Sequence, residues 1–402
     1  MIRAALAWLW RWCSVVVVAV AATVVTVYPT YANWPPIRSD GAGYHIWNYA
    51  LLKGDLSFAW FDGDPEPVAL HQPDPGVRRF TCKYPPGVAL LRLPVMALAT
   101  DPARTGPPFS PAEHWACLAL GAAALIGAVA LGLGACRRAG VPLIWSHASI
   151  LMLTFGTGLF HYATYDAGYS HVYSALLAAA LVWLAVRAAD TQKPVPLVPV
   201  VALVALLLLV RTTNIVLIGS WAAACVLALN GSANRVRAAG AAALGVAVGL
   251  ALTLAVNRAM FGRFTFHTYP GEEFHWHDPH MLLVLGGALN GLFRYAPVLA
   301  VALVAALVAR GTRLAGVVLV GVVAAYVVLY GHWWTWSLGC GFGHRGFVEL
   351  VPFAIPVLAK ALAALPRKVA IAFTALGTAA TIYTVVRMGL YWGDRAFRTA
   401  TF

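Results

Sequence analysis

The chain has 402 residues, of which 61% are hydrophobic and only 11% are charged. Soluble domains average about 45–50% apolar and about 25% charged residues, so this composition excludes a soluble enzyme and a disordered protein. The 28 basic and 15 acidic residues give a net charge of +13. Because the basic residues do not gather in patches with interleaved aromatics, nucleic acid is excluded as a partner. We expect the charge to report membrane topology instead.

Apolar stretches long enough to approach the roughly 20 residues of a membrane span recur along the whole chain. They predict an all-α polytopic membrane protein with one domain, residues 1–402, and about 11 transmembrane helices. Every second short loop carries arginine or lysine, so the positive-inside rule places the N-terminus inside and the C-terminus outside. The expected spans are 8–31, 112–135, 142–160, 168–186, 195–210, 212–229, 236–257, 291–309, 314–331, 347–365 and 369–386.

Two segments are ambiguous. One helix over 195–229 would put Arg211 in the hydrocarbon centre at a cost of about 2.5–3.5 kcal/mol or more, so two short helices that meet near the outer surface are preferred. The segment Tyr84–Ala99 contains Arg92 and Pro94. We interpret it as a helix that lies on or dips into the outer face. Arg92 and Arg294 are expected to snorkel to the interface.

The long connections are all expected on the outer face, and they are rich in Pro, Gly, Trp, Tyr and His: 32–111, 258–290 and 332–346. Of the 15 acidic residues, only Asp190 falls inside on this topology. The titratable chemistry is therefore expected outside. A transporter would be expected to carry ionisable groups or broken helices near the midplane, and the spans contain little of either.

The first outer loop displays a carboxylate close to the end of the first span. Asp40 follows a proline-rich exit and precedes glycines, and Tyr44–Leu52 is interpreted as a short amphipathic helix. A carboxylate in this position is suited to act as a general base on an acceptor hydroxyl. The alternative is an N-cap for the helix that follows, and the residues alone leave both readings open.

The order of motifs in this loop resembles that of GT-C fold glycosyltransferases. The span is followed by Asp40 and Tyr44, then Lys53-Gly54-Asp55, then Lys83-Tyr84-Pro85-Pro86-Gly87 and an apolar helix. The nearest pattern is that of bacterial protein O-mannosyltransferases and lipid A aminoarabinose transferases. The resemblance implies a GT-C-like fold in a bacterial inner membrane, with the active site on the periplasmic or extracellular face.

The same resemblance implies roles for several residues. Asp40 would be catalytic, Lys83 would contact the donor phosphate, and Asp166 would be the second acidic residue, at the opening of the fourth span. The segment from Trp333 to Arg345 is similar to a glycine-rich loop of bacterial members. The family often has two adjacent acids in its first motif, whereas Gly41 follows Asp40 here, so the use of a divalent metal stays open and no cofactor is assigned.

A lipid-phosphate donor needs cations at the outer ends of helices, because it is an anion anchored at the membrane surface. Three basic residues meet this requirement and are expected to bind the donor phosphate: Lys83, Arg211 and Arg345. Further expected substrate contacts are Tyr44, His45, His171, Tyr84, His344 and Trp336.

The resulting hypothesis is an inverting glycosyltransferase that moves a hexose or pentose from a polyprenyl-phosphate donor. The acceptor would be a hydroxyl of a lipid, a glycan or a protein on the outer face of the bilayer. Two alternatives are a lipid-linked glycan ligase or polymerase, whose large outer loop comes late in the chain, and a transporter or flippase.

Two weaker signals remain. His275 and His277, two residues apart, would share one face of a strand, and with Asp278 they suggest a metal site. Cys82 and Cys340 both adjoin expected phosphate-binding residues, so a disulfide between them is a further possibility in an oxidising compartment.

Overall fold

The computed structural model describes residues 2–28, 34–73, 79–269, 271–339 and 341–393. This described part is mostly α-helical and contains one two-stranded antiparallel sheet, in which Leu70 pairs with Cys82. The elements are α1 (Ile2–Val27), α2 (Asp40–Lys53), η1 (Glu66–Val68), β1 (Leu70–His71), β2 (Thr81–Cys82), α3 (Gly87–Ala99), α4 (Pro111–Arg138), α5 (Leu143–Phe155), α6 (Leu159–Thr164), α7 (His171–Thr191), α8 (Leu197–Val210), η2 (Thr212–Asn214), α9 (Ile215–Ala228), α10 (Ser232–Phe261), α11 (Met281–Gly286), α12 (Leu292–Tyr295), α13 (Pro297–Val308), α14 (Arg313–Gly331), η3 (Arg345–Leu350), α15 (Val351–Ala364) and α16 (Arg367–Gly393).

Long apolar helices dominate the bundle. In the described part of the chain, seven helical segments are long and apolar enough to cross a membrane: Leu6–Val27, Pro111–Arg138, His171–Thr191, Ser232–Phe261, Arg313–Gly331, Arg345–Ala364 and Arg367–Gly393. Four shorter apolar helices, α5, α8, α9 and α13, occupy the other expected ranges. A multi-pass membrane protein follows from this composition and length.

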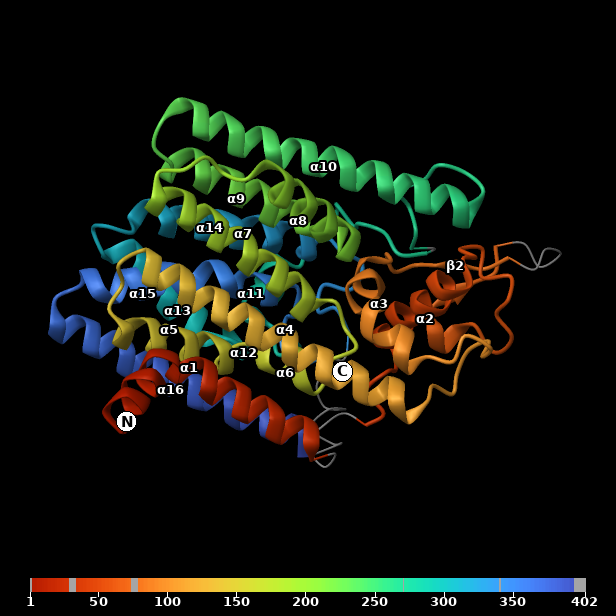
Figure 1. The fold of residues 1–402 in the computed structure, drawn as a ribbon, viewed down its shortest axis with the longest axis horizontal. Helices are drawn as coiled ribbons and strands as arrows, with labels where there is room; N and C mark the ends of the chain where they lie inside the picture. The colour runs from red at the N-terminus through yellow and green to blue at the C-terminus, as the bar shows by residue number, and fades with distance from the viewer. Residues whose placement is uncertain (1, 29–33, 74–78, 270, 340, 394–402) are drawn as a thin grey trace.

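The helices lie side by side between two faces of the molecule (Figure 1). Helices α4, α7 and α15 lie inside the bundle, whereas α10 forms one edge and α1 and α16 form another. The peripheral helices stay apolar although only 22% of the α1 span, 28% of the α10 span and 17% of the α16 span is buried. Apolar surface of this extent is stable against lipid rather than water.

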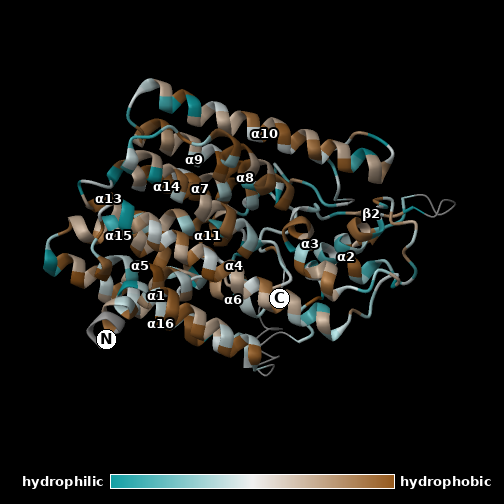
Figure 2. Cartoon of the chain, viewed as in Figure 1, coloured by the Kyte–Doolittle hydropathy of each residue, from teal (hydrophilic) through white to brown (hydrophobic). Residues whose placement is uncertain are grey.

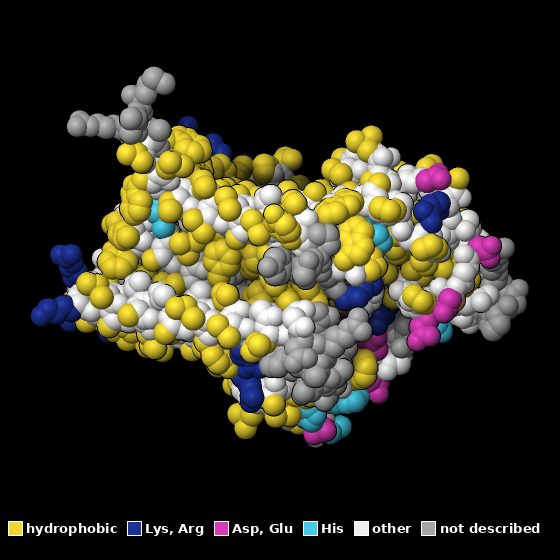
Figure 3. Space-filling view, turned by 90° about the horizontal axis from the view of Figure 1, so that it is seen from below, with side chains coloured by type: hydrophobic (Ala, Val, Ile, Leu, Met, Phe, Trp, Pro, Cys, Tyr) yellow, Lys and Arg dark blue, Asp and Glu magenta, His cyan; other side chains and the backbone are white. Residues whose placement is uncertain are grey.

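One end of the bundle carries α2, α3 and the two strands, and we call this end the loop face (Figure 1). The other end carries the N-terminus and the turn between α4 and α5, and we call it the basic face. Brown, hydrophobic helices fill the space between them in Figure 2. In the view of Figure 3 the acidic side chains gather toward the loop face, and basic side chains project from the basic face.

The helices of the loop face are more enclosed than the sequence suggests. Helix α2 was expected to be amphipathic over Tyr44–Leu52, but every residue from Gly41 to Ala50 is buried. In α3, Arg92 is fully buried, so the expected snorkelling of this side chain is wrong. Its guanidinium donates to the carbonyls of Ala167 and Gly168 at 2.8 Å. The first loop is therefore folded onto the bundle.

The break expected at Arg211 is present. Helix α8 ends at Val210, Arg211 is extended with φ −158°, and η2 leads into α9. Asp166, expected at the opening of the fourth span, lies before the helix instead. Asp166 lies in the turn between α6 and α7, and α7 begins only at His171.

Candidate functional site

A cavity of about 560 Å³ opens at the loop face. Its wall includes the acidic and basic side chains of Asp40, Lys83, Arg38 and Glu66. The side chain of Tyr84 and the prolines of the 107–108 turn also line it. Two residues that were expected to act together, Asp40 and Lys83, thus share one hollow.

Asp40 is the first residue of α2, and Ser39 occupies the N-cap position. The N-cap reading of Asp40 is therefore wrong. The Asp40 carboxylate instead forms an ion pair with Arg345, with 2.8 Å between Oδ2 and the guanidinium nitrogen. The guanidinium also lies over the Tyr169 ring, 5.4 Å from its centroid. The two side chains are 20% and 17% exposed, so this pair remains reachable from outside.

Lys83 follows β2 and precedes the Pro85-Pro86 turn that starts α3. Its Nζ lies 2.7 Å from a carboxylate oxygen of Glu272, and the two side chains are 30% and 18% exposed. The ammonium also lies near the rings of Tyr84 and Tyr269, at 5.3 and 5.8 Å. Aromatic faces and one carboxylate thus hold a cation at the cavity wall.

Two glycines bring the loop of Asp166 against the start of α2. A Cβ atom on Gly41 would lie 3.1 Å from the Cα of Gly168, and one on Gly168 would lie 3.0 Å from the Cα of Gly41. The two backbones are therefore in direct contact. A second acidic side chain at position 41 would not fit without moving this contact, so the single carboxylate of the first motif has a steric reason.

Asp166 is nearly buried. Its Oδ2 lies 2.8 Å from Nε2 of His161, and the other ring nitrogen of His161 accepts a hydrogen bond from the Trp392 indole at 2.8 Å. Because Nδ1 accepts, Nε2 carries the proton and donates to the carboxylate. Trp392 of α16 thereby holds the Asp166 carboxylate in place through His161. Asp166 is placed beside the Asp40 segment but is not among the residues that line the cavity.

Arg211 is not part of the cavity wall. It belongs to a buried cluster with His171 and Glu349, in which His171 Nδ1 lies 2.9 Å from Glu349 Oε1 and Arg211 lies 3.0 Å from His171 Nε2. The Arg211 guanidinium also lies 3.7 Å from the Glu349 carboxylate. Glu349 was missed from the sequence, although it lies four residues after Arg345 in an apolar segment, where a carboxylate is costly.

His45 is fully buried and does not reach the cavity. Its Nε2 lies 2.9 Å from Oε1 of Glu113, which also accepts a hydrogen bond from Tyr49 at 2.7 Å. Burial lowers the pKa of His45, although the contact with Glu113 acts in the opposite direction. Glu113 closes a capping box with Ser110 at the start of α4. His45 therefore ties α2 to α4 rather than contacting a substrate.

Of the remaining residues that were expected to contact substrate, one lines the cavity and the others lie behind it or on the loop of Arg345. Tyr84 lines the cavity, and Tyr44 is buried behind it with 4.5 Å between ring centroids. His344 is buried and donates to the Trp336 carbonyl at 2.8 Å, and burial lowers its pKa to about 3. Trp336 is partly buried on the same loop. His344 is thus a neutral residue that braces the loop of Arg345.

The weak metal-site candidates of the sequence are not arranged as metal ligands in the described part of the chain. Among the described residues, no group of three or more His, Cys, Asp or Glu side chains is arranged to hold one. His275, His277 and Asp278 are exposed, and the carboxylate of Asp278 lies 3.7 Å from a different histidine, His280. The interpretation of this segment as a metal site is wrong.

The proposed disulfide has one partner outside the described residues, Cys340. Cys82 is a free, buried thiol, and its Sγ lies 3.5 Å from the carbonyl of Gly43. Burial raises the pKa of this thiol to about 12, so it is protonated at neutral pH.

Comparisons with known proteins do not assign this chain to a family. No family model and no curated protein matches the chain. It is similar to the crystal structure of the Archaeoglobus fulgidus oligosaccharyltransferase tethered with an acceptor peptide, with a TM-score of 0.48 and 10% identity. The match covers 96% of this chain and 55% of that one, so the chain spans about half of its length.

Proposed function

We propose that the chain is a membrane glycosyltransferase with a GT-C-like fold, which transfers a sugar from a polyprenyl-phosphate donor to an acceptor hydroxyl. The observation that carries the proposal is that Asp40 and Lys83 line one hollow of the loop face, while Arg345 pairs with the Asp40 carboxylate at 2.8 Å. A base and two cations are the groups that such a transfer requires. The loop face would then be the outer, periplasmic or extracellular face of a bacterial inner membrane.

The donor phosphate would exchange partners with the two carboxylates. In the structure Arg345 pairs with Asp40 and Lys83 pairs with Glu272. Both pairs are partly exposed. The contribution of an ion pair to stability falls toward about 0–1 kcal/mol as its exposure to solvent rises. A phosphate offers both cations stronger, charge-assisted hydrogen bonds. Binding of the donor would thereby release the Asp40 carboxylate for catalysis.

The transfer is a single displacement. The acceptor hydroxyl gives its proton to the Asp40 carboxylate, and its oxygen forms a bond to the anomeric carbon of the sugar. The bond from that carbon to the phosphate oxygen breaks, and the electron pair leaves with the polyprenyl phosphate. Lys83 and Arg345 stabilise the charge that develops on the leaving phosphate. Attack from the opposite side inverts the anomeric configuration.

Other residues position these groups. His161 and Trp392 hold Asp166 beside the start of α2, where it would orient the acceptor. Arg211 with His171 and Glu349 supports the segment that carries Arg345, because Glu349 belongs to the same η3 turn. Arg211 is therefore assigned to support rather than to direct contact with the phosphate.

The proposal is tested with the purified full chain and a panel of polyprenyl-phosphate sugars. Release of polyprenyl phosphate from one of these donors, with transfer to an added acceptor, is expected for the wild type. Asp40→Asn is expected to lose turnover by about 10²–10⁴-fold, the contribution typical of a general base.

Asp278→Asn is the matched control, because the Asp278 side chain is 78% exposed and lies outside the cavity wall. It is expected to retain wild-type turnover. Turnover by Asp40→Asn close to that of the control would remove Asp40 from the role of base. Cleavage of no donor by the wild type would contradict the proposed reaction.

A further inference from the structure

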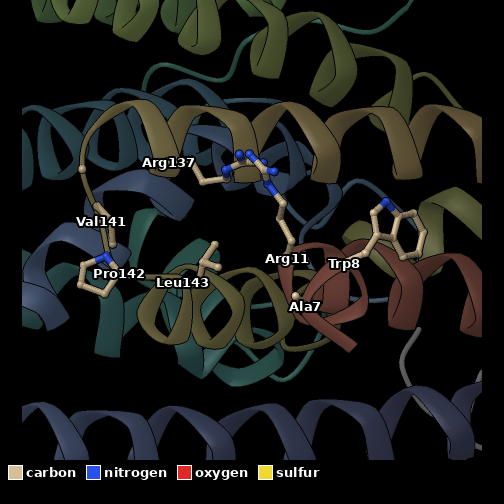
Figure 4. A pocket seen from close by; sticks show the side chains of 8 residues that line it. Ala7, Trp8, Arg11, Arg137, Val141, Pro142 and Leu143 are labelled. Atoms are coloured by element: carbon tan, nitrogen blue, oxygen red, sulfur yellow. The ribbon is translucent and has the colours of Figure 1, made fainter. Parts of the chain in front are cut away.

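A second hollow, of about 810 Å³, lies at the basic face between the first turns of α1 and the turn from α4 to α5. Figure 4 shows the side chains of Arg11 and Arg137 extending from opposite walls, with their guanidinium groups turned toward the same point. The rest of the lining is uncharged: Ala7, Trp8, Gly140, Val141, Pro142 and Leu143.

The two arginines of this hollow differ from their neighbour in their ionic contacts. Among the described residues, neither Arg11 nor Arg137 forms an ion pair or hydrogen bond with an acidic side chain, whereas the neighbouring Arg138 pairs with Asp190 at 3.0 Å. Like charges that converge on one point repel each other unless an anion lies between them. The arrangement therefore has the charge of an anion-binding site.

The walls of the hollow are held in place before any ligand binds. The Arg137 guanidinium lies over the Trp12 ring, 5.8 Å from its centroid. His147 of α5 contacts the Ser14 hydroxyl and the Trp10 carbonyl of α1, both at 2.9 Å. These contacts fix α1 against α4 and α5, so the backbone positions of the two arginines and the side chain of Arg137 are held before a ligand binds.

The surroundings favour a lipid over a soluble anion. Beside the hollow, α1 exposes the large apolar side chains of Leu6, Trp8 and Leu9. A helix with this apolar outer face lies against acyl chains, and tryptophan is typical of the headgroup level. Arginine binds phosphate in a bidentate manner, and basic pockets between membrane helices are suited to anionic headgroups.

We propose that this hollow binds the phosphate of an anionic glycerophospholipid in the leaflet at the basic face. Arg11 and Arg137 bind the phosphate oxygens, and Trp8 and Leu143 contact the glycerol and the first carbons of the acyl chains. The site lies at the other end of the bundle from Asp40 and does not depend on the proposed transfer reaction.

The test measures lipid binding to the purified full chain by native mass spectrometry and by thermal unfolding in neutral detergent. Phosphatidylglycerol is expected to bind and to raise the unfolding temperature more than phosphatidylcholine with the same acyl chains. Arg11→Gln with Arg137→Gln is expected to weaken phosphatidylglycerol binding by at least about tenfold, because each change removes a charged hydrogen-bond donor.

The matched control is Arg367→Gln with Lys368→Gln, which removes the same charge from two exposed residues at the start of α16. It is expected to keep wild-type binding. Equal losses in both double variants, or no loss in the first, would overturn the proposal. Stabilisation by sodium phosphate equal to that by phosphatidylglycerol would contradict a lipid ligand. Each single arginine variant provides the same test if the double variant aggregates.

Discussion

The loop face contains two clusters of charge that are built in opposite ways. Around the cavity, Asp40 pairs with Arg345 and Lys83 with Glu272, and all four side chains are between 17% and 30% exposed. Behind them, His45 and Glu113 form a pair whose side chains are both fully buried. Asp40 and Lys83 of the first cluster line the hollow, whereas the second cluster joins α2 to α4.

The difference in exposure sets what each cluster can do. Ion pairs that water can reach contribute less to stability than fully buried ones, because solvent screens them. Removing one partner of a buried pair costs about 3–5 kcal/mol, because the other is left unsatisfied. Substitutions in the cavity cluster are therefore expected to change turnover, and substitutions in the buried cluster are expected to change stability.

The largest effect is expected at Arg345. Arg345→Met removes the cation that would stabilise the leaving phosphate, and kcat/KM is expected to fall by about 10²–10³-fold. The free energy of unfolding should fall by less than the roughly 3–5 kcal/mol expected for breaking a fully buried pair. Arg294→Met, which removes an exposed arginine, is the control for both measurements. A large loss of stability with normal turnover would show that Arg345 stabilises the fold and does not contact the leaving phosphate.

Glu113→Ala is expected to show the opposite behaviour. It leaves His45, Tyr49 and the Ser110 amide without their acceptor. Unfolding should become easier by about 3 kcal/mol, while turnover per folded molecule stays within about twofold of the wild type. Thermal unfolding and an assay on the monodisperse fraction measure the two quantities. Glu273→Ala, at an exposed position, should alter neither.

A smaller effect is expected at Lys83. Lys83→Gln should raise the KM for the donor by about tenfold, with less change in kcat. This is the loss in binding expected when one charge-assisted hydrogen bond is removed. Glu272→Gln removes the competing carboxylate and should leave KM unchanged or lower it. If both variants raise KM equally, the ion pair between Lys83 and Glu272 is needed intact, and the donor phosphate does not replace Glu272 as the partner of Lys83.

The smallest effect is expected where the two acidic segments touch. In Gly168→Ala the added Cβ would lie 3.0 Å from the Gly41 Cα and from the Pro36 carbonyl. Overpacking of this kind costs about 1–3 kcal/mol, and we expect the low end together with a severalfold loss of turnover. Gly219→Ala in α9 has no atom within 4 Å and should be neutral in both measurements.

The sequence predicted the helices better than the site. The length and spacing of the apolar runs predicted helices along the whole sequence. The cost of placing a charge in hydrocarbon correctly predicted a helix break at Arg211. Hydropathy could not predict that α2 and Arg92 are buried, because their partners come from distant segments such as the Ala167-Gly168 turn.

Among the site residues, Asp40 and Lys83 were predicted together and share the cavity wall. The pairing partners Glu272, Glu349 and Glu113 were missed, since they lie 64 to 189 residues away from the side chains they contact. Spacing along a chain carries no signal for such contacts. Glu349 alone offered a local signal, as an acidic residue within an apolar segment.

The most direct measurement is a structure of the full chain with a bound polyprenyl phosphate. We expect phosphate oxygens about 2.7–3.2 Å from Lys83 Nζ and from the Arg345 guanidinium, the range of charged hydrogen bonds, with Asp40 released from Arg345. A phosphate bound elsewhere, with the 2.8 Å contact between Asp40 and Arg345 still intact, would contradict it.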